Sequence, residues 1–166
     1  MKEKTRQPFL FGLLTIASIL TFSFYLEYAR DIFPCLLCEL QRLIFFALGV
    51  FFLFGTLLHH IRFIRYSMWS IISLTSTLGI IVATRQVWLQ FFPEMAHGAC
   101  GAGLSQLLKI LPLRDVFAQI LEGSAECTEK GWVFLKLDLA EWALILFISY
   151  LFYALFHFMK EWRKRA

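Results

Sequence analysis

Four long apolar runs, each with an interior almost free of charge, constrain this chain more than any other feature. They lie at about Phe9–Leu26, Leu40–Leu58, Ile64–Val82 and Leu139–Met159, and none contains proline. A hydrocarbon core about 30 Å thick is crossed by roughly 20 helical residues, because each residue advances a helix by about 1.5 Å. The sequence therefore predicts an all-α membrane protein, in which residues 1–166 form a single integral membrane domain built on a four-transmembrane-helix bundle.

The composition fits a protein embedded in a bilayer and excludes a large soluble domain. Hydrophobic residues make up 59% of the chain and charged residues only 17%, whereas soluble domains contain about 25% charged residues. The net charge of +4 comes from short basic clusters beside apolar runs, which is typical of membrane orientation signals and not of a phosphate-binding surface. We expect lipid as a partner and no nucleic acid. Phenylalanines such as Phe45–Phe46 and Phe51–Phe52 are expected to contact lipid or core without a chemical role.

The distribution of charge among the loops predicts the orientation of the bundle. One side carries nine basic and two acidic residues, at the N-terminus, in the turn with Arg62 and Arg65, and in the C-terminal tail. The other side carries seven basic and ten acidic residues. The positive-inside rule then places both termini in the cytoplasm and the loops Glu27–Cys38 and Thr84–Asp138 outside. The first run is too long for a signal-peptide core and no small-residue cleavage site follows it, so an uncleaved first span is expected.

All four cysteines belong to the two predicted outer loops. Cys35 and Cys38 end the first loop, and Cys100 and Cys127 lie in the second. An even number of cysteines in an oxidising compartment indicates disulfides. A Cys100–Cys127 bridge would close a 27-residue separation and could stabilise the loop by about 3–4 kcal/mol. A bridge within the C-x-x-C segment closes a ring too small to be a useful staple, so that pair is better explained as a redox pair or half of a metal site.

Arg42 follows Cys38 by four residues, which places both side chains on one face if the second helix begins near this point. Its charge would stabilise a Cys38 thiolate and a developing anion on an electron acceptor beside it. The alternative is an arginine that only reaches the lipid head groups, and the neighbouring cysteine pair favours the chemical role. Glu27 and Glu39, which flank the first loop, are interpreted as interfacial residues.

The second outer loop carries an amphipathic pattern on both sides of Pro112. Apolar residues recur there at helical spacing: Leu104, Leu107, Leu108 and Leu111, then Leu113, Val116, Phe117, Ile120 and Leu121. The pattern predicts short amphipathic helices on the outer leaflet that would tether Cys100 near the membrane. A loop packed on the bundle explains the same pattern equally well.

Several of these segments resemble a known family. The segment 34–42, with the sequence P-C-L-L-C-E-L-Q-R, is similar to the P-C-x-L-C-x-x-Q/E-R motif of the DsbB family of bacterial disulfide-bond formation proteins. The resemblance covers nearly the whole chain and includes the segments 86–90, 125–129 and 132–142. Where well-studied members have a histidine, this chain has Gln86. A glutamine at this position is expected to form a hydrogen bond to a quinone oxygen, but it cannot relay a proton as an imidazole does.

The resemblance implies an enzyme of the bacterial inner membrane, a protein-dithiol:quinone oxidoreductase that generates disulfides. Its implied partners are a periplasmic DsbA-like thiol oxidase with a thioredoxin fold and the membrane quinone pool, either ubiquinone or menaquinone. Carried over by position, Cys35 and Cys38 are the quinone-coupled pair, with Cys38 and Arg42 beside the quinone. Cys100 would form the mixed disulfide with the partner, and Cys127 would link back to Cys35.

The chemistry of sulfur leads to the same function without the family. Thiol–disulfide exchange only moves a disulfide between pairs, so net formation needs a two-electron oxidant. A quinone dissolved in lipid suits a C-x-x-C at the membrane boundary, and the sequence contains no flavin or haem motif. Two alternatives remain: a four-span scaffold resembling tetraspanins with purely structural disulfides, and a zinc site formed by the four cysteines. We expect the redox function and no metal.

Overall fold

The structure, a computed structural model, describes residues 2–30, 35–95, 112, 114–115, 127–128 and 133–163. Its four long helices are α1 (Lys2–Arg30), α2 (Leu36–Leu57), α3 (Arg62–Phe91) and α6 (Leu139–Arg163). Each is long and apolar enough to cross a bilayer, which confirms the predicted four-helix membrane fold. A short 3-10 helix, η1 (Pro93–Met95), follows α3, and two short strands, β1 (Val133–Phe134) and β2 (Leu137–Asp138), precede α6.

The helices extend beyond the predicted spans, and two of the differences affect the site. The second outer loop was predicted to begin at Thr84, but α3 continues to Phe91, because the chain offers no glycine or proline after Val82 until Pro93. Residues 84–91 are therefore helical and not part of a loop. The helix α2 begins at Leu36 rather than at Leu40, so its first turn includes part of the C-x-x-C segment.

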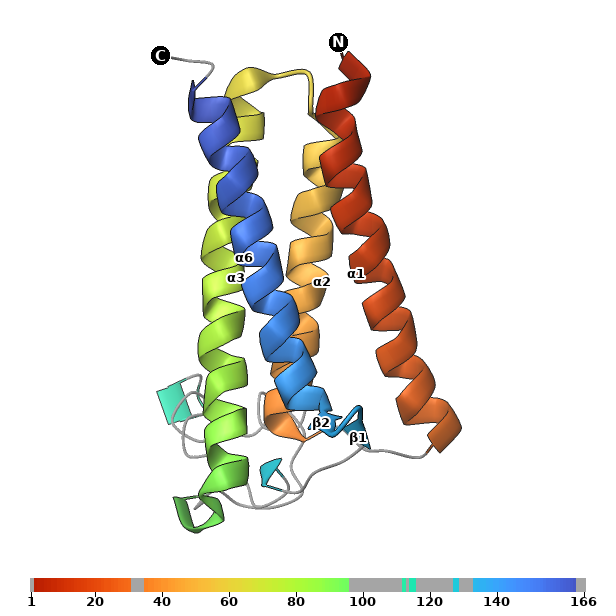
Figure 1. The fold of residues 1–166 in the computed structure, drawn as a ribbon, viewed down its shortest axis with the longest axis vertical. Coiled ribbons are helices and arrows are strands. Elements are labelled where there is room, and N and C mark those ends of the chain that lie inside the picture. The colour runs from red at the N-terminus through yellow and green to blue at the C-terminus, as the bar shows by residue number, and fades with distance from the viewer. Residues whose placement is uncertain are drawn as a thin grey trace.

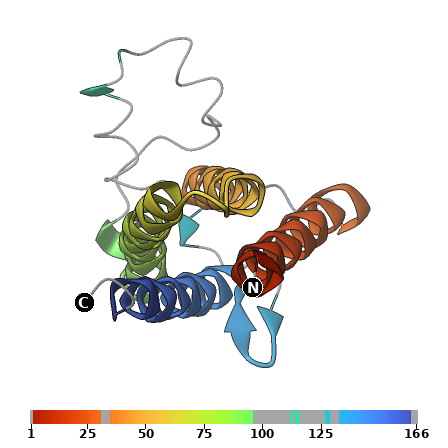
Figure 2. The same cartoon turned by 90° about the horizontal axis from the view of Figure 1, so that it is seen from above.

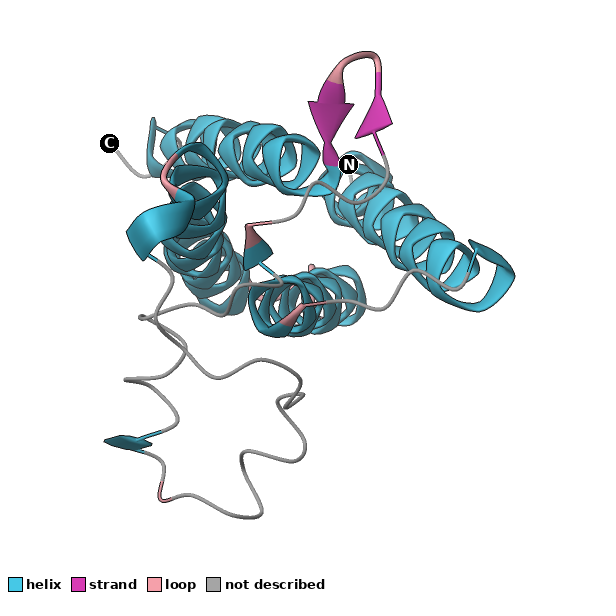
Figure 3. Ribbon diagram, turned by 90° about the horizontal axis from the view of Figure 1, so that it is seen from below, coloured by secondary structure: helices cyan, strands magenta, loops and turns pink. Residues whose placement is uncertain are grey.

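The four helices run up and down the bundle. Figure 1 shows both termini at one end, beside the turn between α2 and α3. The opposite end contains the last turns of α1 and α3 and the first turns of α2 and α6. Viewed along the bundle, α2, α3 and α6 form a group with α1 at its side (Figures 2 and 3). The helix α3 packs against α2 and α6, and α1 packs against α2.

Stacked aromatic rings fill the centre of the bundle. The rings of Phe9 and Trp69 stack with centroids 4.2 Å apart, and those of Phe45 and Phe147 with centroids 4.1 Å apart. All four side chains are buried. Phe46, the neighbour of Phe45, is 61% exposed on the outside of the bundle. Adjacent phenylalanines thus divide between core and lipid-facing surface, because successive residues point about 100° apart on a helix.

Glycines such as Gly12 and Gly79 let aromatic rings approach neighbouring helix backbones. A Cβ atom on Gly12 of α1 would lie 2.3 Å from the Phe52 ring, and one on Gly79 of α3 would lie 2.4 Å from the Phe147 ring. Small residues at helix interfaces permit such close packing in membranes, where dispersion contacts rather than the hydrophobic effect hold helices together.

The start of α6 is fixed by a reciprocal capping box. The Glu141 amide donates to Oδ1 of Asp138 at 2.9 Å, and the Asp138 amide donates to Oε2 of Glu141 at 3.0 Å. Together these bonds satisfy two backbone donors at the helix terminus. Gln90 near the end of α3 also donates to Asp138, which is buried. The box therefore ties the first turn of α6 to the last turns of α3.

A short hairpin precedes this box and was not predicted. Val133 pairs with Asp138 and Phe134 with Leu137, and the two turn residues, Leu135 and Lys136, have positive φ angles of 54° and 69°. The amphipathic surface helices predicted for residues 104–121 lie almost entirely outside the described residues, so they stay a prediction.

We predict that Gly79→Ala destabilises the bundle, because the new methyl group would overlap the Phe147 ring, which is held in place by its stack with Phe45. Overpacking of this kind costs about 1–3 kcal/mol, more than the helix propensity that alanine adds. Thermal unfolding in detergent measures the effect. Gly49→Ala is the control, since its Cβ would lie 3.3 Å from Ile16; equal melting temperatures for the two variants would contradict the prediction.

Candidate active site

The C-x-x-C segment forms the first turn of α2. Cys35 is the N-cap residue, with an extended backbone, and its sulfur accepts a hydrogen bond from the Cys38 amide at 3.4 Å. The helical turn brings the two side chains together, so that their Sγ atoms lie 2.9 Å apart. Cys38 thus lies at the positive end of the α2 dipole, where an anion is stabilised. Both residues are free thiols in the structure.

Cys127, from the second outer loop, lies against Cys35. Contact with the Cys127 thiol, contact with Cys38 and burial together raise the pKa of the Cys35 thiol. Cys35 therefore keeps its proton more firmly than a free thiol does. Its sulfur lies between two possible disulfide partners, Cys38 and Cys127. The structure brings together three of the four cysteines predicted as the site, while Cys100 lies outside the described residues.

The three cysteines differ in their exposure to solvent. Cys127 is fully buried and Cys35 is 7% exposed, whereas Cys38 is only half-buried. Leu36, Leu37 and Leu89 complete a small apolar cluster around the sulfurs. The site therefore excludes water around Cys35 and Cys127, and Cys38 is the most exposed of the three residues.

Gln86 contacts the sulfurs directly. It lies on the part of α3 that extends beyond the predicted span, and its Nε2 donates to Cys38 Sγ at 3.0 Å and to Cys35 Sγ at 3.5 Å. Its Oε1 accepts a hydrogen bond of 2.8 Å from Nε2 of Gln41 on α2. The amide predicted to bind a quinone oxygen is thus occupied by the cysteine pair, and the quinone contact stays a prediction.

Arg42 lies one turn after Cys38 on α2, as predicted, but its guanidinium extends to α1. Nε donates to Ser23 Oγ at 2.7 Å and Nη2 to the Ser23 carbonyl at 3.2 Å. Nη1 forms an ion pair with Glu27, and the guanidinium lies 5.1 Å from the centre of the Phe24 ring. Glu27, interpreted from the sequence as an interfacial residue, is the counter-ion of Arg42.

Sequence reasoning missed Glu27, Ser23 and Gln41 as site residues. The signal for Glu27 was present, because Arg42 lies inside an apolar run. A charge in such a run needs a partner of opposite sign at a similar depth. Gln41 carried a weaker signal, as a polar residue between Leu40 and Arg42 in the same motif. For the zinc alternative, the described residues contain no group of three or more side chains that could hold a metal ion. Cys100 lies outside the described residues.

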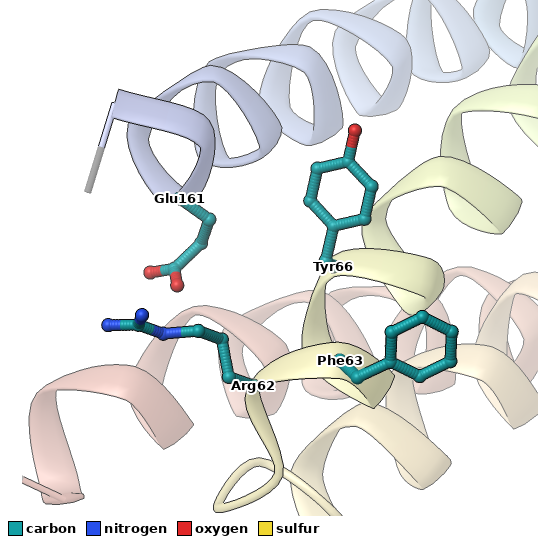
Figure 4. A pocket seen from close by; sticks show the side chains of 4 residues that line it. All are labelled: Arg62, Phe63, Tyr66 and Glu161. Atoms are coloured by element: carbon teal, nitrogen blue, oxygen red, sulfur yellow. The ribbon is translucent and has the colours of Figure 1, made fainter. Parts of the chain in front are cut away.

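A pocket at the other end of the bundle is separate from this site. Arg62, Phe63 and Tyr66 of α3 line it with Glu161 of α6, and the Arg62 guanidinium points toward the Glu161 carboxylate (Figure 4). Arg65 also binds Glu161, with Nε donating to Oε2 at 2.9 Å. These residues join α3 to α6 at the end where the termini lie, away from the three described cysteines.

We predict that Cys127 cross-links to Cys35 in preference to Cys38, because the structure places its thiol against Cys35. Under mild oxidation, the Cys38→Ser/Cys100→Ser variant should form its disulfide about tenfold faster than the Cys35→Ser/Cys100→Ser variant, since reacting groups already in contact gain most from proximity. Peptide mapping under non-reducing conditions measures both rates. A faster Cys38–Cys127 link would contradict the arrangement.

Comparisons with known proteins point to one family. A family model described as disulfide bond formation protein DsbB matches residues 5–157. The chain is 38% identical over 138 residues to disulfide bond formation protein B of Hahella chejuensis, and the matched region covers 82% of this chain and 83% of that protein. It is 39% identical over 145 residues to the protein of the same name from Acinetobacter baylyi, covering 84% and 83%. It is 32% identical over 160 residues to disulfide bond formation protein B 1 of Pseudomonas aeruginosa, covering 94% and 96%. The chain belongs to the DsbB family.

Proposed function

We propose that this protein is a membrane oxidoreductase that makes disulfides for the bacterial envelope. It takes two electrons from a periplasmic DsbA-like dithiol protein and passes them to a membrane quinone. The observation that carries the proposal is the position of Cys35, whose sulfur contacts both Cys38 and Cys127. A sulfur placed between two others can exchange one disulfide partner for the other, which a purely structural bridge does not require.

The proposed exchange conserves electrons at each step. The partner's dithiol reduces a Cys100–Cys127 disulfide through a mixed disulfide at Cys100 and leaves oxidised. The Cys127 thiolate then attacks Cys35 in a Cys35–Cys38 disulfide; the old S–S bond breaks, and its electron pair leaves on Cys38. Cys100 finally attacks Cys127, which restores the Cys100–Cys127 bridge and leaves Cys35 and Cys38 as the reduced pair.

The residues around Cys38 suit a quinone as the final acceptor. A bound quinone would take up two electrons and two protons from the reduced Cys35–Cys38 pair. Cys38 is the more exposed residue of that pair, and it lies at the helix end that stabilises anions. Arg42, one turn further along α2, supplies a positive charge whose side chain is 17% exposed. These two residues would hold the acceptor at the edge of the hydrocarbon region.

The proposed location is the bacterial inner membrane, with the cysteines on the periplasmic side. The arrangement of the chain supports this orientation, because the termini and the α2–α3 turn lie at the end opposite the first turn of α2, which carries the cysteine pair. That end carries the basic clusters, and the positive-inside rule assigns such an end to the cytoplasm. A four-span scaffold with structural disulfides is the weaker candidate, because it gives no reason for a buried third thiol beside the C-x-x-C pair.

We predict that the purified protein, supplied with a short-chain ubiquinone, catalytically oxidises a reduced thioredoxin-fold protein. Cys38→Ser should abolish quinone reduction, since the electrons then have no exit, yet leave one equivalent of substrate oxidised by the Cys100–Cys127 pair. Loss of quinone absorbance and thiol titration of the substrate measure the two half-reactions. Multiple turnovers by Cys38→Ser, or none by the parent with either ubiquinone or menaquinone, would refute the proposed function.

We predict that Arg42→Ala slows quinone reduction by about 10²-fold, because a donor aimed at developing negative charge is lost from a water-poor site. Single-turnover exchange with the thiol substrate should stay within about twofold of the parent. Arg42→Lys should fall between, since it keeps the charge and loses the planar fork. Quinone-reduction kinetics over a range of quinone concentrations measure the effect.

Arg65→Ala is the matched control for Arg42→Ala. It removes a partly buried arginine–glutamate pair of the same kind at the other end of the bundle. The control separates a loss of stability from a loss of chemistry. Equal quinone kinetics in the two alanine variants would leave Arg42 as only a link between α1 and α2.

A further inference from the structure

Two buried carboxamides meet at the interface of α2 and α3, beside the cysteine pair. Gln41 is 5% exposed and Gln86 is 3% exposed. Burying a carboxamide is unfavourable unless its polar atoms find hydrogen-bond partners. Both side chains satisfy this requirement through one chain of bonds, which runs from Gln41 to Gln86 and from Gln86 to the sulfurs.

Gln41 contacts the end of the Gln86 carboxamide that faces away from the cysteines. A carboxamide has an oxygen that accepts and a nitrogen that donates, and the two ends have nearly the same shape. The Gln41 Nε2 donates to Oε1 of Gln86 at 2.8 Å, so this oxygen is held on the side away from the cysteines. The Nε2 of Gln86 then faces Cys38 and Cys35, at 3.0 Å and 3.5 Å.

We propose that Gln41 is a positioning residue that, by fixing the orientation of Gln86, keeps N–H donors on the Cys35–Cys38 pair and stabilises a Cys38 thiolate. The proposal rests on the proposed function for the event that makes this thiolate. When the Cys127 thiolate, formed as the Cys100–Cys127 bond is reduced, attacks Cys35, the Cys35–Cys127 bond forms and the Cys35–Cys38 bond breaks. The electron pair of the broken bond leaves on Cys38, next to the Gln86 donor.

The Gln86 carboxamide comes from another helix, α3, and contacts the Cys38 sulfur directly. Arg42 lies one turn away, but it directs its guanidinium to Ser23 and Glu27 of α1. A hydrogen bond to a charged group is strong enough to change the thiolate population about tenfold or more. A carboxamide turned the other way would place its oxygen against the sulfur and repel the same charge. The orientation that Gln41 imposes therefore decides the sign of the effect.

The test isolates Cys38 in the full-length protein in detergent, with Cys35, Cys100 and Cys127 replaced by serine. The rate of Cys38 alkylation by iodoacetamide is measured from pH 6 to pH 11, and each variant is normalised to its own rate at the highest pH, which cancels changes in access. Gln86→Met should lower the normalised rate at pH 7 by about tenfold, and Gln41→Met by about threefold to tenfold. The curves of parent and variants should converge at high pH, where every thiol is ionised.

A double-mutant cycle separates action through Gln86 from a merely structural role. If Gln41 works through Gln86, adding Gln41→Met to Gln86→Met should leave the normalised rate unchanged. Gln90→Met is the matched control, because Gln90 lies one turn after Gln86 on α3 and contacts Asp138 instead of the sulfurs. It should keep the parental profile even if it lowers the melting temperature. Gln41→Leu repeats the measurement with another apolar side chain if Gln41→Met does not fold.

Two results would overturn the proposal: a parental profile in Gln86→Met or in the Gln41 variants, or a further loss when Gln41→Met is added to Gln86→Met. Alkylation needs neither quinone nor a partner protein, so these outcomes are independent of turnover. A parent protein that fails to reduce quinone while its Gln41 variants show the altered profile would refute the proposed function and leave the orientation of Gln86 by Gln41 intact.

Discussion

The contact of Cys35 with two other sulfurs is the interaction on which the rest of the site depends. It requires α2 to begin immediately after Cys35, so that one helical turn returns Cys38 to the same point. It also requires the second outer loop to bring Cys127 into the apolar cluster formed by Leu36, Leu37 and Leu89. Burial then keeps water away from Cys35 and Cys127, and the polar partners of these two sulfurs must come from the protein.

The bundle supplies these partners because α3 continues past its predicted span, as far as Phe91. The last turns of α3 carry Leu89, which packs on the cysteines, and Gln86, which donates to them. The same turns carry Gln90, which holds the Asp138 cap of α6. The end of α3 therefore positions both the redox pair and the start of α6. A displacement of α3 would move its contacts at both places.

The sequence predicts the fold and the cysteine pair because both are local patterns. Apolar runs of sufficient length specify spans, and the spacing of Cys35 and Cys38 places them on one helical turn. The contacts of Gln86 and Arg42 are different in kind, since each depends on the rotation of a neighbouring helix. Nothing in the spacing along α2 indicates that Ser23 and Glu27 of α1 face Arg42. The end of α3 was misplaced for a further reason: hydrophobicity marks where lipid ends, whereas a helix ends where its backbone hydrogen bonds do.

The attachment of Arg42 to α1 leaves its proposed role intact. A guanidinium has five N–H donors in a fixed plane, and the contacts of Arg42 to the described residues use one donor on each of its three nitrogens. Two N–H groups thus have no partner among the described residues, and they could bind an anion without breaking the link to Ser23 and Glu27. Glu27 offsets the positive charge while the site is at rest, which lowers the cost of keeping an arginine near the hydrocarbon region. Because α1 fixes the plane of the guanidinium, an acceptor that gained negative charge beside these N–H groups would meet donors already oriented, with little reorganisation.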